Sequence, residues 1–487
     1  MTLRSRTFHG GAGLGVALGA LGATLALAPT ALANTYVANK LGDHAPNGCT
    51  PPDCTLREAI RKANNHAGPD TVVLRGGNVY NLGLSNTAGE EDQNATGDLD
   101  VLGRLTIGSS NKKLATVDAN GIDRVFEVGT SAPVSATFKR VTIRGGDAAD
   151  SSEHGGGIDS EYGGTLKLVR SKVVGNRTNS EGGGIAADGG TLKVIRSVIA
   201  RNSATKPSQN AGGIEGEPGS TQNEVISISR SRIVDNHAAA GGGGIYAYNR
   251  LTINRSTLSG NTAGEAGGAI YNYGTATITK STITGNHANT NVGGGIFNAN
   301  AAGNLVLKFS TLSGNVAPNG DGGAIENYGA ATLVNDTITK NHTAGYGGGV
   351  EADSNSPTVL NAVTIARNTA GTGGGIEGNL IVSNSLIALN SSSGLGPDCH
   401  PGPTIISTGH NLVGDTTDCG GVFGGSTNDF TNVSPRIARL ADNGGPTKTI
   451  ALRRHTKAIN HAGNDAPKRD QRGVERHNPD IGAYERR

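Results

Sequence analysis

The chain has 487 residues, of which 77 are glycine, ten tyrosine, seven phenylalanine, one methionine and none tryptophan. This composition excludes an ordinary globular core of large side chains, so burial has to come from many small, repeated contributions. Residues 1–33 hold two arginines and no acid, so the rest of the chain carries 40 basic and 40 acidic residues. Such a balance argues against a nucleic-acid or anionic-membrane partner.

The N-terminus has the three-part layout of a secretory signal peptide. It begins with two arginines, Arg4 and Arg6, and continues with an uncharged stretch from Gly10 to Ala28. Two small residues, Ala31 and Ala33, follow. We predict a signal peptide over residues 1–33, cleaved after Ala33. A membrane anchor is the alternative interpretation. No second apolar run of that length follows, so we expect no membrane span after cleavage and an extracellular protein, secreted or loosely associated with the surface.

Four cysteines in an exported chain favour two disulfides over a metal site, because the outside of the cell is oxidising and no CxxC pair has a matching His or Cys pair. We prefer the pairs Cys49 with Cys54 and Cys399 with Cys419. The sequence alone leaves three connectivities open.

Residues 34–70 are predicted to form an N-terminal cap that contains a helix ending near Asn65. Thr55 and Glu58 have the spacing of a capping box. The apolar residues Leu56, Ala59, Ile60 and Ala63 fall on one face of this helix. The run from Cys54 to Ile60 resembles the CSLREA segment found near the N-terminus of bacterial surface β-helix proteins, with Thr55 in place of the serine.

The body of the chain is a repeat. Residues 71–145 contain strand-like runs, such as Thr71–Leu74, that we interpret as irregular first coils. Residues 146–395 are predicted to form nine regular coils. Each regular coil has two or more glycines followed, directly or after one small residue, by a branched aliphatic residue. This aliphatic residue recurs every 25 to 31 residues. These marker residues are Ile158, Ile185, Ile214, Ile245, Ile270, Ile296, Ile325, Val350 and Ile376.

Within one unit, Gly267 to His287, the apolar residues alternate in three short runs separated by single turns. Three short strands per repeat make one triangular coil. The predicted fold is therefore all-β, a right-handed parallel β-helix with three short strands per coil and an N-terminal helical cap.

A second marker is one asparagine in every coil, and it predicts a ladder. The residues are Asn176, Asn202, Asn236, Asn261, Asn286, Asn315, Asn341, Asn368 and Asn390. Stacked coils place equivalent residues about 4.8 Å apart. Inward amides at that spacing can donate to and accept from one another, so we predict a structural asparagine ladder.

The repeat resembles that of polymorphic outer membrane adhesins, which pair a Gly-Gly-Ala-Ile element with a Phe-x-x-Asn element. Gly267–Ile270 and Gly322–Ile325 match the first element. The phenylalanine is replaced here by Leu258, Ile283, Leu312 or Ile338. No outer-membrane barrel follows the repeat, so that family's membrane route is not expected. The resemblance covers about half of the chain.

Residues 396–487 are predicted to cap the C-terminal end, because the open strand edges of a solenoid have to be covered. The stretches Leu440–Thr447, Asp470–Gly473 and Asp480–Glu485 resemble a choice-of-anchor domain of the Q type. In that family a sorting anchor usually follows, whereas this chain stops at Arg487 without a sorting motif. The expectation is release or loose retention at the surface.

Two columns of residues are predicted to face solvent, one and three positions after each marker. The first column is Asp159, Ala186, Glu215, Tyr246, Tyr271, Phe297, Glu326, Glu351 and Glu377. The second column is Glu161, Asp188, Glu217, Tyr248, Tyr273, Ala299, Tyr328, Asp353 and Asn379. Together they hold nine carboxylates, six aromatic residues and no lysine or arginine. We call these two columns the acid–aromatic stripe.

The stripe suits a carbohydrate chain, since aromatic residues contact sugars and carboxylates accept hydrogen bonds from hydroxyls or hold Ca²⁺. A merely solvated sheet face is the alternative. We therefore predict a monomeric, adhesin-like protein that binds polysaccharide or a cell-surface glycan, without a cofactor other than Ca²⁺ on the stripe. A polysaccharide lyase or glycoside hydrolase of the pectin-degrading type is the competing hypothesis, although no catalytic residue stands out.

A basic column lies six residues before the ladder positions, at Arg170, Arg196, Arg230, Arg255 and Lys280, and it ends at Phe309. These cations are expected to pair with acids, to bind an anionic partner or to remain solvated.

Overall fold

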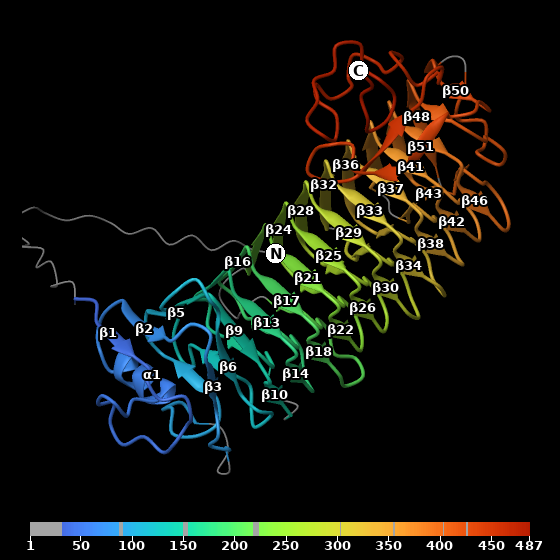
Figure 1. Cartoon of the computed structure of the whole chain (residues 1–487). Coiled ribbons are helices and arrows are strands. Elements are labelled where there is room, and N and C mark those ends of the chain that lie inside the picture. The colour runs from blue at the N-terminus through green and yellow to red at the C-terminus, as the bar shows by residue number, and fades with distance from the viewer. Residues whose placement is uncertain are drawn as a thin grey trace, which may run out of the picture.

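The computed structural model describes residues 32–86, 91–149, 154–217, 224–301, 303–353, 356–402, 404–424 and 427–487. The predicted signal peptide lies outside the described residues as far as residue 31. The described chain forms one elongated solenoid, in which the coils follow one another from β1 and α1 at one end to β50 at the other (Figure 1). None of the described helices is long and apolar enough to cross a membrane.

The coil between residues 267 and 288 shows the unit of the solenoid. The three strands predicted here are β27 (Ile270–Asn272), β28 (Thr275–Thr279) and β29 (Thr282–Thr284). The structure adds a fourth strand of two residues, β30 (His287–Ala288), directly after the ladder asparagine. Single residues with positive φ, such as Lys280 at 52° and Gly285 at 62°, turn the chain between these strands.

Four parallel sheets run along the solenoid, one for each strand of the coil. We number them in coil order. Sheets I to IV contain β27, β28, β29 and β30 and have 12, 14, 14 and 10 strands. Sheet II runs from β1 (Thr35–Val37) and β2 (Asp70–Leu74) to β48 (Ile405–Gly409). Sheet III runs from β3 (Val79–Asn81) to β50 (Phe430–Thr431), and sheet IV from β10 (Asp147–Ala148) to β46 (Ser391–Ser392).

Sheet I carries the marker residues and is therefore the sheet of the stripe. Its strands are β4 (Leu99–Val101), β7 (Phe126–Val128), β11 (Ile158–Ser160), β15 (Ile185–Ala187), β19 (Ile214–Gly216), β23 (Ile245–Ala247), β27 (Ile270–Asn272), β31 (Ile296–Asn298), β35 (Ile325–Asn327), β39 (Val350–Ala352), β43 (Ile376–Gly378) and β47 (Cys399–His400). Equivalent residues pair in register, as Ile270 does with Ile296. The predicted parallel β-helix is confirmed.

The core is a continuous file of aliphatic side chains between the sheets. The nine marker residues are all fully buried, and one hydrophobic cluster extends from Ala38 to Phe423. Each buried Val, Leu or Ile side chain stabilises the fold by about 1.5–3 kcal/mol. In every regular coil the strands of sheets I to III supply at least one such residue each, and those of sheet II often two, such as Leu166 and Leu168, so tryptophan and methionine are not needed to fill the interior.

The ladder asparagines are buried and bonded to one another. Each Nδ2 donates to the Oδ1 of the next asparagine at 2.9 to 3.0 Å. The last one, Asn390, donates to Asp398 Oδ1 at 2.9 Å. A second amide row, which sequence reasoning missed, runs from Asn272 to Asn298 and Asn327 with 2.6 Å bonds.

The N-terminal end is covered by α1 (Leu56–Asn64), which packs against β1, β2 and β4. Thr55 and Glu58 form the predicted capping box. Arg57 is fully buried, forms an ion pair with Asp43 at 2.9 Å and donates to the carbonyl of Asp98 at 2.7 Å. The helix is therefore attached both to the N-terminal segment and to the first coils.

The C-terminal segment, by contrast, lies along the flank of sheet III and not only over the last coil as expected. Its two strands, β51 (Ile437–Ala441) and β52 (Thr449–Leu452), form an antiparallel pair. Gln471 Nε2 donates to the carbonyl of Ser310 at 2.9 Å, and the amide of Ala483 donates to Thr364 Oγ1 at 2.9 Å. Gln471 Nε2 also donates to Thr311 Oγ1 at 2.9 Å, so two threonines of sheet III, Thr311 and Thr364, help to hold the segment on this flank. The disulfides are Cys49–Cys54 and Cys399–Cys419.

Replacing Asn286 by leucine should destabilise the protein. The leucine removes the Oδ1 that accepts from Asn261 at 2.9 Å and the Nδ2 that donates to Asn315 at 2.9 Å. Two lost hydrogen bonds and two stranded amides should lower the free energy of unfolding by about 2 to 4 kcal/mol. Coils contact only their neighbours, so hydrogen exchange should rise first near residues 261–315.

The control is Asn319→Leu, because Asn319 is exposed in a turn and its side chain donates an exposed hydrogen bond to the carbonyl of Asn289. It should lower the free energy of unfolding by less than about 0.5 kcal/mol. Equal, small effects of the two substitutions would show that the ladder contributes nothing to stability.

Candidate functional site

The first column of the stripe is continuous over the whole of sheet I. Glu326 pairs with Phe297 on one side and Glu351 on the other, and Glu351 pairs with Glu377. The structure extends the column to Asp100 and Glu127 at one end and to His400 at the other. Sequence reasoning missed these three residues because no glycine marker precedes them. An apolar residue directly before each of them was the available signal.

The expectation that the first column faces solvent is wrong for its carboxylates. Asp159, Glu215 and Glu326 are at most 1% exposed, and Glu351 and Glu377 are 6% exposed. The glycine turn before each strand folds across the side chain that follows the marker. A Cβ on Gly347 would lie 2.7 Å from Cβ of Glu351, and one on Gly373 would lie 2.8 Å from Cβ of Glu377. The glycines therefore shape the corner and also cover the first column.

The second column is more open. Asp188, Glu217, Tyr248, Tyr273 and Tyr328 are partly exposed, and Asp353 is exposed. This column is therefore the part of the stripe that a large ligand can reach.

Aromatic residues occupy the middle of both columns. Tyr246 stacks on Tyr271, and Tyr248 stacks on Tyr273, each with ring centroids 4.7 Å apart. Phe297 makes an edge-to-face contact with Tyr271 at 4.9 Å. The stacked faces cover one another, so the outward parts of these rings are their edges and hydroxyls. Among the described residues, no hydrogen-bond partner holds the hydroxyl of any of the four stacked tyrosines.

Acids gather at each end of the aromatic segment. At the N-terminal end, burial raises the pKa of Asp188 to about 8 and that of Glu215 well above its usual range, and nearby carboxylates add to both shifts. At the C-terminal end, burial raises the pKa of Glu351 to about 12, with further contributions from Glu377 and Glu326. Burial also raises the pKa of Glu326 well above its usual range. Burial therefore favours the neutral form of both Glu326 and Glu351.

Two groups within the described part of the chain could hold a metal ion. One is His154, Glu181 and Glu215, and the other is Asp92, Asp100 and Glu127, with ligand atoms within 4.8 Å of one another in each group. Arg124 lies close to the second group, 3.7 Å from Glu127. Sequence reasoning included only Glu215 of these six residues, because the others lie outside the two columns as the markers defined them.

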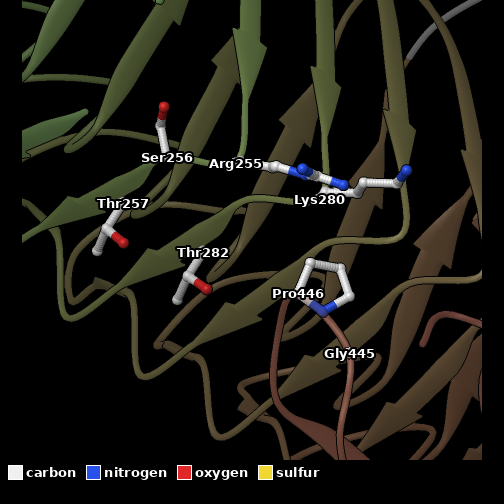
Figure 2. Close-up of a pocket in the computed structure, with 7 residues that line it drawn as sticks. All are labelled: Arg255, Ser256, Thr257, Lys280, Thr282, Gly445 and Pro446. Atoms are coloured by element: carbon white, nitrogen blue, oxygen red, sulfur yellow. The ribbon is translucent and has the colours of Figure 1, made fainter. Parts of the chain in front are cut away.

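The basic column occupies the tight turn between sheets II and III. Its five cations all have a positive φ of 49° to 53°, namely Arg170, Arg196, Arg230, Arg255 and Lys280. None of these five cations forms an ion pair with another described residue. Arg255 and Lys280 line a cavity of about 430 Å³ together with Gly445 and Pro446 of the C-terminal segment. Figure 2 shows both cationic side chains extending over Pro446.

In the comparisons with known proteins, the family model that matches this chain in sequence covers the length of about one coil. The Chlamydia polymorphic membrane protein (Chlamydia_PMP) repeat matches residues 255–273, which contain the ladder residue Asn261 and the marker Ile270. None of the curated proteins compared with the chain matches it. Among solved structures, the crystal structure of pectate lyase Pel9A matches with a TM-score of 0.38 and 15% identity, over 94% of this chain and 97% of that chain.

The buried carboxyl of Glu351 should make stability depend on pH. The unfolded chain loses this proton near pH 4.3, whereas the folded chain keeps it, so the folded state binds more protons above that pH. The free energy of unfolding should therefore fall as the pH rises from about 4. Glu351→Gln removes the ionisable group and should raise the free energy of unfolding at pH 8 by at least about 1 kcal/mol, with little change at pH 4.

Urea unfolding of the two proteins at both pH values measures this difference. Asp353→Asn, at an exposed position two residues later, is the matched control and should leave the pH dependence unchanged. A Glu351→Gln protein with the same pH dependence as the unmodified protein would show that Glu351 is not buried as a neutral acid.

Proposed function

We propose that the protein is an extracellular, adhesin-like β-helix protein that binds a polysaccharide or a cell-surface glycan along the acid–aromatic stripe. The observation that carries the proposal is the partly exposed second column, in which stacked tyrosines lie between two groups of carboxylates. The match to a repeat of Chlamydia polymorphic membrane proteins supports a role at a surface. The two disulfides fit an oxidising, extracellular location.

Hydrogen bonding, and not ring stacking, is the mode of recognition that fits this geometry. Tyr248 and Tyr273 cover each other's faces at 4.7 Å, so a sugar ring has no free face between them. Their hydroxyls can donate to and accept from sugar hydroxyls. Glu217 and Asp353, which flank the tyrosines in the same column, add carboxylate oxygens that accept from sugar hydroxyls. A chain of sugars lying along the solenoid would meet such a group in every coil from Glu217 to Asp353 except the coil of Ala299.

The competing lyase or hydrolase receives less support from these residues. A hydrolase needs two carboxyl groups about 5 to 9.5 Å apart on either side of the scissile bond. Glu326 and Glu351 pair in adjacent coils, but they are only 1% and 6% exposed, so a glycosidic oxygen cannot approach between them. A lyase of the pectin-degrading type needs a lysine or arginine that removes a proton from the substrate as its base, and the stripe contains neither residue.

The double substitution Tyr248→Phe and Tyr273→Phe tests the proposal, because it keeps the ring stacking and removes only two hydroxyls. A glycan array would first identify a polysaccharide that the unmodified protein binds. Two lost hydrogen bonds at about 1 kcal/mol each should weaken that binding roughly 30-fold. Calorimetric titration measures the change, and circular dichroism should stay the same.

Tyr36→Phe is the control, since Tyr36 is a partly exposed tyrosine at the N-terminal end of sheet II. It should not alter glycan binding. Unchanged affinity of the double variant would contradict binding along the stripe. Release of unsaturated sugars, followed by ultraviolet absorbance, would instead favour a lyase.

A further inference from the structure

The N-terminal part of the stripe contains a carboxylate whose burial needs a partner. Glu215 is fully buried, and neither of its carboxylate oxygens accepts a hydrogen bond from any described residue. The imidazole of His154 lies beside it, with Nδ1 3.7 Å from Oε2. That Nδ1 is itself buried and has no hydrogen-bond partner among the described residues. An unpartnered buried carboxylate is costly, so something has to compensate it.

The fold brings His154, Glu181 and Glu215 together from three coils. The amide of Gly155 donates to the carbonyl of Glu181, so His154 and Glu181 precede equivalent glycine turns in neighbouring coils. Glu215 belongs to the next coil, on β19. Ala186 occupies the intervening position of the first column, and its methyl group leaves the space into which the longer side chains extend. The ligand atoms of the three residues lie within 4.8 Å of one another.

Positive charge is scarce at this point. Asp159, two positions earlier in the same column, has Arg124 at 2.9 Å. Within the described ranges, no lysine or arginine forms an ion pair with Glu181 or Glu215. Glu217 and Asp188 bring further carboxyl groups close to the same place. A cation at this point would neutralise a concentration of acids that the chain itself leaves uncompensated.

We propose that His154, Glu181 and Glu215 bind a divalent transition-metal ion such as Zn²⁺. One imidazole nitrogen and two carboxylate oxygens are ligands that Zn²⁺ accepts at about 2.0 to 2.2 Å, whereas Ca²⁺ takes six to eight oxygen ligands. Three protein ligands leave one position for water, and the His154 side chain, 32% exposed, opens the site to solvent. Asn210 Nδ2 donates to Glu181 Oε1 at 2.8 Å and orients that carboxylate.

The bound ion links three consecutive coils, so it should stabilise the N-terminal part of the solenoid. This inference is independent of the proposed glycan binding, because Glu215 is fully buried and because His154 and Glu181 belong to neither column of the stripe. A ligand that binds only the folded state raises the melting temperature with its concentration. The melting temperature therefore reports binding without any assay of function.

The test is calorimetric titration of the chelator-treated full chain with Zn²⁺ and, separately, with Ca²⁺. One Zn²⁺ per chain should bind and raise the melting temperature. Glu215→Gln, which keeps the side-chain volume, and His154→Ala, at a partly exposed position, should each weaken Zn²⁺ binding at least tenfold and abolish the shift in melting temperature. Glu326→Gln, at an equally buried carboxylate of the same column, is the control and should bind as the unmodified protein does.

Absence of stoichiometric Zn²⁺ binding would overturn the proposal and would mean that protons alone compensate the acids. Binding that survives both substitutions would also overturn it, because the ion would then lie elsewhere. If the protein bound one equivalent of Ca²⁺ and His154→Ala left that binding unchanged, His154 would not be a ligand. That result would contradict the site as proposed.

Discussion

The spacing between coils, fixed by parallel backbone hydrogen bonding, is the constraint on which the rest of this structure depends. Strands in a sheet lie about 4.8 Å apart, so an in-register repeat stacks each residue on its equivalents. The same spacing appears between the rings of Tyr246 and Tyr271, whose centroids are 4.7 Å apart. It also lets the amide of Asn261 reach that of Asn286 at 2.9 Å. Aliphatic, amide and aromatic columns all follow from this one distance.

Stacking like residues has opposite consequences for amides and for acids. An amide carries both a donor and an acceptor, so a buried file of asparagines satisfies itself, and only its last member needs Asp398. Ionised carboxylates only accept, so neighbours such as Glu326 and Glu351 cannot satisfy each other. Burial therefore favours their protonated forms and raises the pKa of Glu351 to about 12. The same fold thus gains stability from its asparagines and loses some through its acids.

The repeat markers predicted the coil well, because glycine spacing and period-two alternation are local. They located the three main strands, as β27, β28 and β29 show. They could not predict that the turn at Gly347 covers Glu351, because that contact depends on the path of the chain over its own strand. They also could not predict that Gln471 lies on the flank of sheet III, since its partner Ser310 is far away in the sequence. Long-range contacts of irregular segments leave no periodic pattern to detect.

Small residues within a column decide where unlike side chains meet. A full column keeps each side chain between its two equivalents, as Phe297 stays between Tyr271 and Glu326. Where the column holds only a methyl group, as at Ala186, longer side chains from coils on both sides can extend into the same space. His154 approaches Glu215 at this point although they belong to different coils. Local chemistry in such a solenoid therefore arises where the repeat is interrupted, and a site search should begin at the interruptions of each column.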